Sequence, residues 1–268
     1  MRSTRRNMPD YIDNLAIEAA KRVEEGYYKN TSKSRLTNKP KSLREAVLKC
    51  TKAPIISEVK FASPSSGVLR EYTPPGMIAR ELVEGGSVGI SVLTEPKNFG
   101  GKLEFLGEIR SQVGVPILMK DIVLSPLQIE AAYKWGADAI LLIQALFDRG
   151  YCEGDIQSMI GQAHSFGLEV LLESHSEDEF LRAVKTAADL VGINNRDLKT
   201  LTVNLEVTKS ILARHRPRGK VAVSESGIST PEDIRYLREC GAQAFLVGTS
   251  IMKSNNIREK VAQLVESL

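Results

Sequence analysis

Hydrophobic residues follow two different patterns along most of this chain. From residue 54 onward, short runs of consecutive apolar residues alternate with longer stretches in which apolar residues recur every three or four positions. The first pattern predicts buried parallel strands, and the second predicts amphipathic helices. We expect eight strands, at Pro54–Val59, Gly89–Leu93, Pro116–Met119, Ala139–Ile143, Glu169–Leu172, Leu190–Ile193, Val221–Ser224 and Ala244–Val247.

The stretches between these strands carry helix start and stop signals. Several begin with a residue whose side chain can cap a helix, most often followed by proline, and several end at glycine. The starts are Thr73-Pro74, Ser125-Pro126, Ser176-Glu177 and Thr230-Pro231, and the glycines are Gly85, Gly136, Gly167 and Gly241.

Eight alternating strand and helix units predict an α/β fold, namely a (β/α)8 TIM barrel. An open, doubly wound sheet is the alternative. Such a sheet usually has a glycine-rich phosphate turn after its first strand, and Ser63-Pro64-Ser65-Ser66-Gly67 does not match that motif. The barrel is therefore the fold that we expect.

Two further helices are predicted ahead of the first strand. Apolar residues at helical spacing over Pro9–Tyr28 follow Asp10, which can cap the first turn. Ser42 and Glu45 form a capping-box pattern that opens a shorter helix through Cys50. We interpret residues 1–268 as one barrel domain, with residues 1–50 as an N-terminal helical extension.

Composition and charge narrow the range of partners. The chain has 36 Lys and Arg against 33 Asp and Glu, and its N-terminal basic residues are followed by acidic residues rather than interleaved with aromatic ones. This pattern argues against a nucleic acid partner. No apolar run reaches the ~18 residues of a membrane span, and the N-terminus lacks the apolar core of a signal peptide. We expect a cytoplasmic protein with no membrane partner.

The cysteines and histidines give no sign of a metal site. The three cysteines are far apart, as are the three histidines, so neither a disulfide framework nor a metal cluster is predicted. His175 follows Glu173 by two residues and could share its face. We interpret this lone loop histidine as structural or solvated.

Charged and amide side chains stand at the ends of the predicted strands, where the active sites of such barrels lie. Each alone fits an ion pair at the barrel rim, and Lys120 could simply pair with Asp121. Together they place three carboxylates, two lysines and an arginine around one opening, which favours a site that divides them into acids and bases. The candidates are Glu58, Lys60, Lys120, Glu173, Asn194, Arg196, Glu225 and Ser226.

Glu173 is the foremost candidate for a general base. Val170, Leu171 and Leu172 precede it. We predict apolar surroundings that favour its neutral acid form and make it a usable base.

Small residues follow the last two predicted strands. Ser224–Ser229 and Val247–Ser250 can present backbone N–H groups, and the loops after strands seven and eight of such barrels commonly bind phosphate. Ser63 could add a hydroxyl. Two ordinary tight turns are the alternative interpretation.

Five motifs stand at the ends of the predicted strands, namely Pro54–Lys60 with Ala62–Ser65, Ser91–Glu95, Pro116–Asp121, Gly192–Leu198 and Ser224–Ile228. On these motifs, the chain resembles the indole-3-glycerol phosphate synthase family of tryptophan biosynthesis from about Ser42 to its C-terminus. The resemblance implies a barrel whose N-terminal extension covers the catalytic face. It also implies ring closure of 1-(2-carboxyphenylamino)-1-deoxyribulose 5-phosphate, with loss of carbon dioxide and water.

The resemblance also implies roles for single residues. Lys120 matches the general acid that polarises the substrate carbonyl, and Glu173 matches the carboxylate that manages protons. Glu58 and Lys60 match an acid/base pair that faces the anthranilate carboxylate. Asn194 and Arg196 match residues that orient the substrate, with Glu225 and Ser226 beside them, and the phosphate-binding positions match Ser63, Gly227, Gly248 and Thr249.

Three positions depart from the family pattern. Phe61 and Ser66 stand where basic residues are common, and Ile122 stands where an aromatic residue often follows the Lys-Asp pair. We therefore expect changed electrostatics at the phosphate rim and a changed wall against the aromatic ring. We predict no cofactor, no metal, a small phosphorylated substrate, and a monomer or homodimer.

Two other functions remain open at this point. A Schiff-base aldolase on the same fold also needs a lysine at a strand end, although the carboxylates expected near Lys120 favour its charged form over the neutral amine. A non-catalytic barrel that binds a phosphate-bearing ligand would tolerate loss of Glu173 or Lys120, and both are present.

Overall fold

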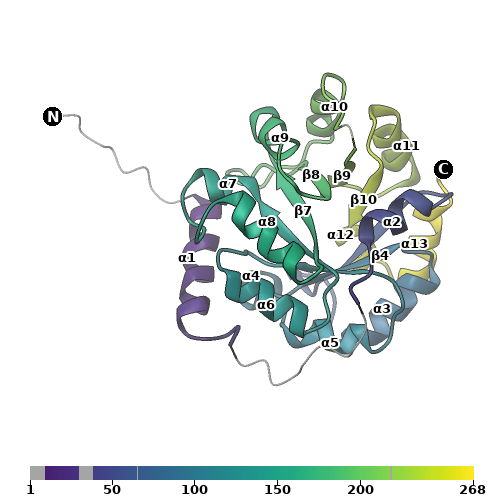
Figure 1. The fold of residues 1–268 in the computed structure, drawn as a ribbon. Coiled ribbons are helices and arrows are strands. Elements are labelled where there is room, and N and C mark those ends of the chain that lie inside the picture. Colours follow the sequence, from purple (N-terminus) through teal and green to yellow (C-terminus); the bar gives the residue numbers. More distant parts are fainter. Residues whose placement is uncertain (1–9, 30–38, 65, 218) are drawn as a thin grey trace.

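Eight parallel strands close into a barrel in the computed structural model, which describes residues 10–29, 39–64, 66–217 and 219–268 (Figure 1). The first strand pairs with both the second and the last, which closes the sheet. The predicted (β/α)8 barrel is confirmed, and no predicted strand end is more than two residues from the observed one. The strands are β1 (Ile55–Val59), β4 (Gly89–Leu93), β5 (Ile117–Lys120), β6 (Ala139–Ile143), β7 (Glu169–Ser174), β8 (Leu190–Asn194), β9 (Val221–Glu225) and β10 (Ala244–Val247).

Helices surround the barrel, and none among the described residues is long and apolar enough to cross a membrane. The outer helices are α3 (Pro75–Glu84), α5 (Glu104–Arg110), α6 (Pro126–Lys134), α8 (Ile156–Ser165), α9 (Glu177–Ala183), α10 (Glu206–Leu212), α11 (Pro231–Cys240) and α13 (Ile257–Val265). Five short elements in the loops after strands were not predicted as separate elements. They are the hairpin of β2 (Ala62–Ser63) with β3 (Gly67–Val68), and the helices α4 (Pro96–Phe99), α7 (Gln144–Asp148) and α12 (Thr249–Met252).

Most of the predicted helix caps are present. Ser125 and Thr230 form capping boxes at the starts of α6 and α11, and the Ser176 side chain accepts a hydrogen bond at the start of α9. The cap predicted at Thr73 was wrong. Pro74 precedes a second proline, which disfavours helical backbone at residue 74, so α3 begins at Pro75 without a side-chain cap.

The side chains of the strands divide between two apolar cores. Residues such as Ile56, Leu118 and Leu171 point into the barrel, whereas their neighbours, such as Ile55 and Met119, pack under the outer helices. Successive side chains of a strand point to opposite faces. The inward-pointing residues near the C-terminal strand ends therefore converge on one opening.

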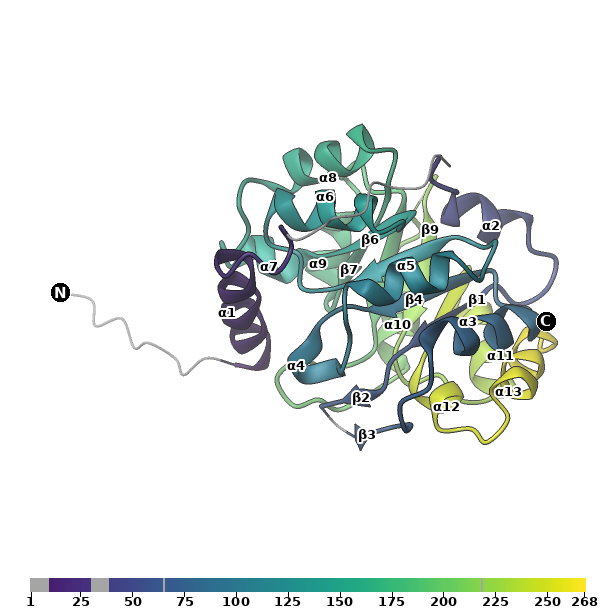
Figure 2. The same ribbon diagram turned by 90° about the horizontal axis from the view of Figure 1, so that it is seen from below.

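The two helices that precede the barrel lie at its opposite ends (Figure 2). The first helix, α1 (Tyr11–Glu24), buries Ile12 and Leu15 at the opening formed by the C-terminal strand ends. The second, α2 (Leu43–Lys49), packs Leu43 against the backbone of Gly89, where β4 begins. The backbone N–H of Arg44 donates to Glu169, the first residue of β7, at 2.9 Å.

The position of α2 corrects the prediction that residues 1–50 as a whole cover the catalytic face. Its apolar residues close the end where the strands begin, which is the face opposite the candidate catalytic one. The predicted capping box is only half formed. Ser42 Oγ accepts from the Glu45 N–H at 2.9 Å, but the Glu45 carboxylate pairs with Lys49 at 2.7 Å.

Candidate active site

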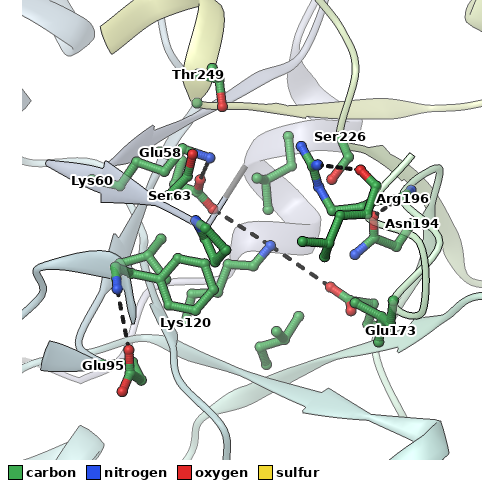
Figure 3. Close-up of a pocket in the computed structure, with 18 of the residues that line it drawn as sticks. Glu58, Lys60, Ser63, Glu95, Lys120, Glu173, Asn194, Arg196, Ser226 and Thr249 are labelled. Carbon is green, nitrogen blue, oxygen red and sulfur yellow. Dashed lines mark hydrogen bonds and ion pairs between the residues drawn. The ribbon is translucent and has the colours of Figure 1, made fainter. Parts of the chain in front are cut away.

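A cavity of about 290 Å³ lies between α1 and the C-terminal ends of the barrel strands (Figure 3). It brings together almost all of the residues singled out from the sequence. Glu225 does not line it, but is fully buried and contacts Lys120, which does. The predicted residues that line the cavity are Glu58, Lys60, Ser63, Lys120, Glu173, Asn194, Arg196, Ser226, Gly227, Gly248 and Thr249.

Lys120 lies among three carboxylates that come from three different strands. Its Nζ is 3.1 Å from Glu225 Oε2, 3.5 Å from Glu58 Oε2 and 3.7 Å from Glu173 Oε2. Burial lowers the pKa of Lys120, but the interactions with Glu225, Glu58 and Glu173 outweigh burial and raise this pKa above its usual range. Lys120 is therefore a charged ammonium group at neutral pH.

Glu58 and Lys60 form a second ion pair beside the first cluster. Their Oε1 and Nζ atoms are 2.6 Å apart. Burial raises the pKa of Glu58, but the charges of Lys60 and Lys120 outweigh burial and hold this pKa below its usual range. The cavity thus contains an ionised carboxylate between two lysines.

Two glycines leave the space that these carboxylates occupy. A Cβ atom at Gly192 would lie 2.2 Å from Glu225 Oε1, and a Cβ atom at Gly248 would lie 2.5 Å from Glu58 Oε1. Neither contact is possible without movement of the carboxylate. Any side chain at these positions would displace the charges around Lys120.

The loops after β9 and β10 form one side of the cavity and are joined to each other. Ser250 Oγ donates to the Ile228 carbonyl at 2.9 Å. Asn195 Nδ2 donates to the carbonyl of Ser226 at 3.1 Å, and Ser226 has a left-handed backbone with φ of 65°. The buried hydroxyl of Ser63 faces the same cavity and has no hydrogen-bond partner within the described part of the chain.

Comparisons with known proteins identify the family. The family model for indole-3-glycerol phosphate synthase matches residues 11–264. The chain belongs to the indole-3-glycerol phosphate synthase family. It is 41% identical to the indole-3-glycerol phosphate synthase of Methanocaldococcus jannaschii over 97% of this chain and 90% of that one. It is 36% identical to that of Lachnoclostridium phytofermentans over 97% and 92% of the two chains.

A solved structure supports the fold alone. The thiamine phosphate pyrophosphorylase from Pyrococcus furiosus superposes with a TM-score of 0.61 over 84% of this chain and 97% of that one. The sequence identity is 18%. The likeness shows a shared barrel and says nothing of a shared reaction.

In this member of the synthase family, the prediction that Glu173 favours its neutral acid form is wrong. Burial raises its pKa, but His175, Lys120 and Asn194 outweigh burial and hold the pKa well below its usual range. The physical reason is that successive side chains of β7 point to opposite faces of the sheet. Val170 and Leu172 belong to the outer core, so the apolar run does not surround the carboxylate.

Glu225 is the carboxylate that favours its neutral form. Burial is the largest cause and raises its pKa, and the negative charge of Glu173 raises it further, although Lys120 opposes both. The pKa of Glu225 is therefore raised while that of Glu173 is lowered. Two carboxylates that share Lys120 differ in ionisation, as expected of a site that needs both an acid and a base.

His175 belongs to the site, which the sequence interpretation missed. Its Nε2 is 3.1 Å from Glu173 Oε1, and its Nδ1 is 3.5 Å from Glu179 Oε2. The spacing of two residues from Glu173 was the signal that it shares the face of that carboxylate.

A buried polar network that joins α1 to the barrel was also missed. Arg22 Nη1 of α1 is 2.9 Å from Glu95 Oε1, and its Nη2 is 3.7 Å from Asp121 Oδ1. Asp121 also accepts hydrogen bonds from Tyr28 Oη at 3.0 Å and from Thr94 Oγ1 at 2.6 Å. Because Asp121 follows Lys120 in the chain, this network holds α1 next to the central lysine.

Two of the positions that depart from the family pattern differ in what they contact. Phe61 packs against Phe105 and Tyr72, with ring centroids 5.8 and 5.5 Å away, and does not line the cavity. Ile122 does line it. The departure at Ile122 therefore changes the cavity wall directly.

Proposed function

We propose that this chain is an indole-3-glycerol phosphate synthase, a carboxy-lyase of tryptophan biosynthesis. It would convert 1-(2-carboxyphenylamino)-1-deoxyribulose 5-phosphate into indole-3-glycerol phosphate, carbon dioxide and water. Beyond family membership, the observation that carries the proposal is a charged lysine that contacts three carboxylates in a cavity at the C-terminal strand ends.

The first chemical step needs a proton donor at the ketone of the substrate. The ring carbon that bears the carboxylate attacks the ketone carbon, and the ketone oxygen takes a proton as the new bond forms. Lys120 is suited to this role because its neighbours keep it protonated. Loss of carbon dioxide then leaves its bonding electrons in the ring and restores aromaticity.

The second half of the reaction needs an acid and a base together. The hydroxyl formed from the ketone leaves as water after it takes a proton, and another proton leaves the substrate as the double bond forms. The ionised Glu173 is suited to accept a proton, and Glu225, whose pKa is raised, is suited to hold one. Glu58 and Lys60 would face the substrate carboxylate and keep the charge balanced.

The substrate phosphate would bind on the side of the cavity formed by the loops after β9 and β10. Gly227, Gly248 and Thr249 line that side, and the Ser63 hydroxyl is available for a hydrogen bond. Arg196 and Asn194 would orient the ribulose portion, with Ser226 beside them.

The aromatic ring of the substrate would lie against the apolar wall of the cavity. This wall combines Ile12 and Leu15 of α1 with Phe99, Ile122 and Ile143 of the barrel. Helix α1 would thus cover the bound substrate and contribute to its binding. This is the part of the predicted N-terminal cover that we retain.

The alternatives receive less support from the site. An imine-forming aldolase needs a neutral amine, and three carboxylates around Lys120 hold it in the charged form. A non-catalytic binding barrel has no need of two carboxylates with opposite pKa shifts. The cytoplasmic location, the oligomeric state and the absence of a cofactor stay predictions.

The direct test is turnover of the purified chain with the proposed substrate, followed by the fluorescence of the indole product. We expect product with the wild type and none with Lys120→Met, which keeps an unbranched side chain one heavy atom shorter and loses its charge. Wild-type protein that binds the substrate without forming indole would contradict the proposal.

A further inference from the structure

The three histidines of the chain each pair with a carboxylate, and only one of these pairs reaches the cavity. His164 Nε2 is 2.9 Å from Asp189 Oδ2, and His215 Nε2 is 2.6 Å from Glu177 Oε1. His175 pairs with Glu173 of the cavity and is the least exposed of the three, at 11% against 37% for His164 and 28% for His215. His164 and His215 therefore provide controls for His175 within the same chain.

Both nitrogens of the His175 ring face carboxylate oxygens. Nε2 faces Glu173 at the end of β7, and Nδ1 faces Glu179 in α9. The backbone N–H of His175 also donates to Glu179 Oε2 at 2.7 Å, which fixes the chain at this point. Two carboxylates this close to one imidazole ring favour its protonated, cationic form.

We infer that His175 is a positioning residue, an imidazolium that Glu179 holds in place and that keeps the Glu173 carboxylate ionised and directed toward Lys120. This inference rests on the proposed function, because the reaction gives Glu173 its role as a base. His175 itself does not line the cavity and would act through Glu173.

The charges around His175 agree with this role. Glu173 and Glu179 contact it directly, Asp197 faces it from the loop after β8, and Lys120 lies beyond Glu173. Burial lowers the pKa of His175, but its ion pairs with Glu173 and Glu179 outweigh burial and raise the pKa to about 9. The ring is thus charged at neutral pH and loses its charge as the pH rises through about 9.

His175 also gives a reason why two similar carboxylates behave differently. Glu173 and Glu225 both contact Lys120, but only Glu173 has a histidine beside it. With the imidazolium present, the negative charge is favoured on Glu173 and the proton on Glu225. Without it, the two carboxylates would compete more evenly for one proton.

The kinetic test compares His175→Gln with His215→Gln, in which the matched outer pair is lost. For His175→Gln we expect kcat to fall by about 10-fold with a smaller change in KM, since a partner of a catalytic base contributes less than the base itself. The acidic limb of the pH profile of kcat should move to higher pH, because Glu173 without its cation binds a proton more readily. His215→Gln should change neither.

A second measurement does not depend on turnover. Nuclear magnetic resonance titration of the histidine rings should show His175 losing its proton near pH 9 in the wild type, and at lower pH in Glu179→Gln. An ordinary titration of His175, or wild-type kcat with an unmoved acidic limb in His175→Gln, would overturn the inference. A wild type that lacks turnover but shows the raised titration would contradict the proposed function and leave the ion-pair arrangement supported.

Discussion

A side chain added at Gly192 should disturb the contact between Glu225 and Lys120. In Gly192→Ala, the new Cβ atom would lie 2.2 Å from Glu225 Oε1, whereas ordinary contact begins at 3.4 Å. The carboxylate must therefore move by about 1.2 Å. A displacement of that size breaks the 3.1 Å contact with Lys120 or forces it into a new geometry.

The expected effect on Gly192→Ala is larger in catalysis than in folding. A shift of about 1 Å in a catalytic group can reduce kcat by about 10²-fold. Overpacking by one methyl group costs about 1–3 kcal/mol in the free energy of unfolding. We would measure kcat by indole fluorescence and stability by urea denaturation on the same preparations.

Gly161→Ala is the matched control for this prediction. Gly161 lies inside helix α8, and a Cβ atom there meets nothing within 4 Å. We expect unchanged kcat and slightly greater stability, because alanine favours a helix over glycine. The double variant Gly192→Ala with Glu225→Asp should recover part of the lost stability, since the shorter carboxylate makes room. Wild-type kcat in Gly192→Ala would refute the reasoning.

Three further variants test other parts of the site. Arg22→Met should lower the free energy of unfolding by about 3 kcal/mol and raise KM, because it leaves Glu95 and Asp121 buried without their cation. Lys21→Met, on the exposed side of α1, is the control and should change neither quantity in denaturation and kinetic assays. Ser63→Ala should raise KM several-fold at unchanged kcat, and unchanged KM would remove its hydroxyl from phosphate binding. Glu173→Gln should lower kcat by about 10²-fold or more with the fold retained, and activity within a few-fold of the wild type would exclude it as the base.

The strands and the barrel could be predicted from the sequence because both faces of a parallel sheet are buried. Continuous apolar runs such as Ala139–Ile143 mark such strands directly. The hairpin of β2 with β3 could not be separated from its loop, since strands of two residues show no periodicity. The position of α2 could not be predicted either. An apolar helix face shows that a helix packs against something, but not at which end of a barrel.

The positions of the site residues could be predicted better than their charges. Strand ends such as Lys120 and Glu225 converge because the barrel closes, and that follows from the eight repeated units. The pKa of Glu173 depends instead on Asn194 from a neighbouring strand and on His175 beyond its own strand end. Arg22 and Asp121 are far apart in the sequence, so no local sequence pattern predicts that they pair.

The central claim is that Lys120 acts as a charged acid and not as an imine-forming amine, and chemical trapping tests it most directly. The wild type would be treated with borohydride in the presence of substrate, and the peptide that contains Lys120 would be analysed by mass spectrometry. A charged acid surrounded by three carboxylates forms no imine, so the account predicts an unmodified peptide alongside normal indole formation. A reduced substrate adduct on Lys120 would contradict the account and restore the aldolase interpretation.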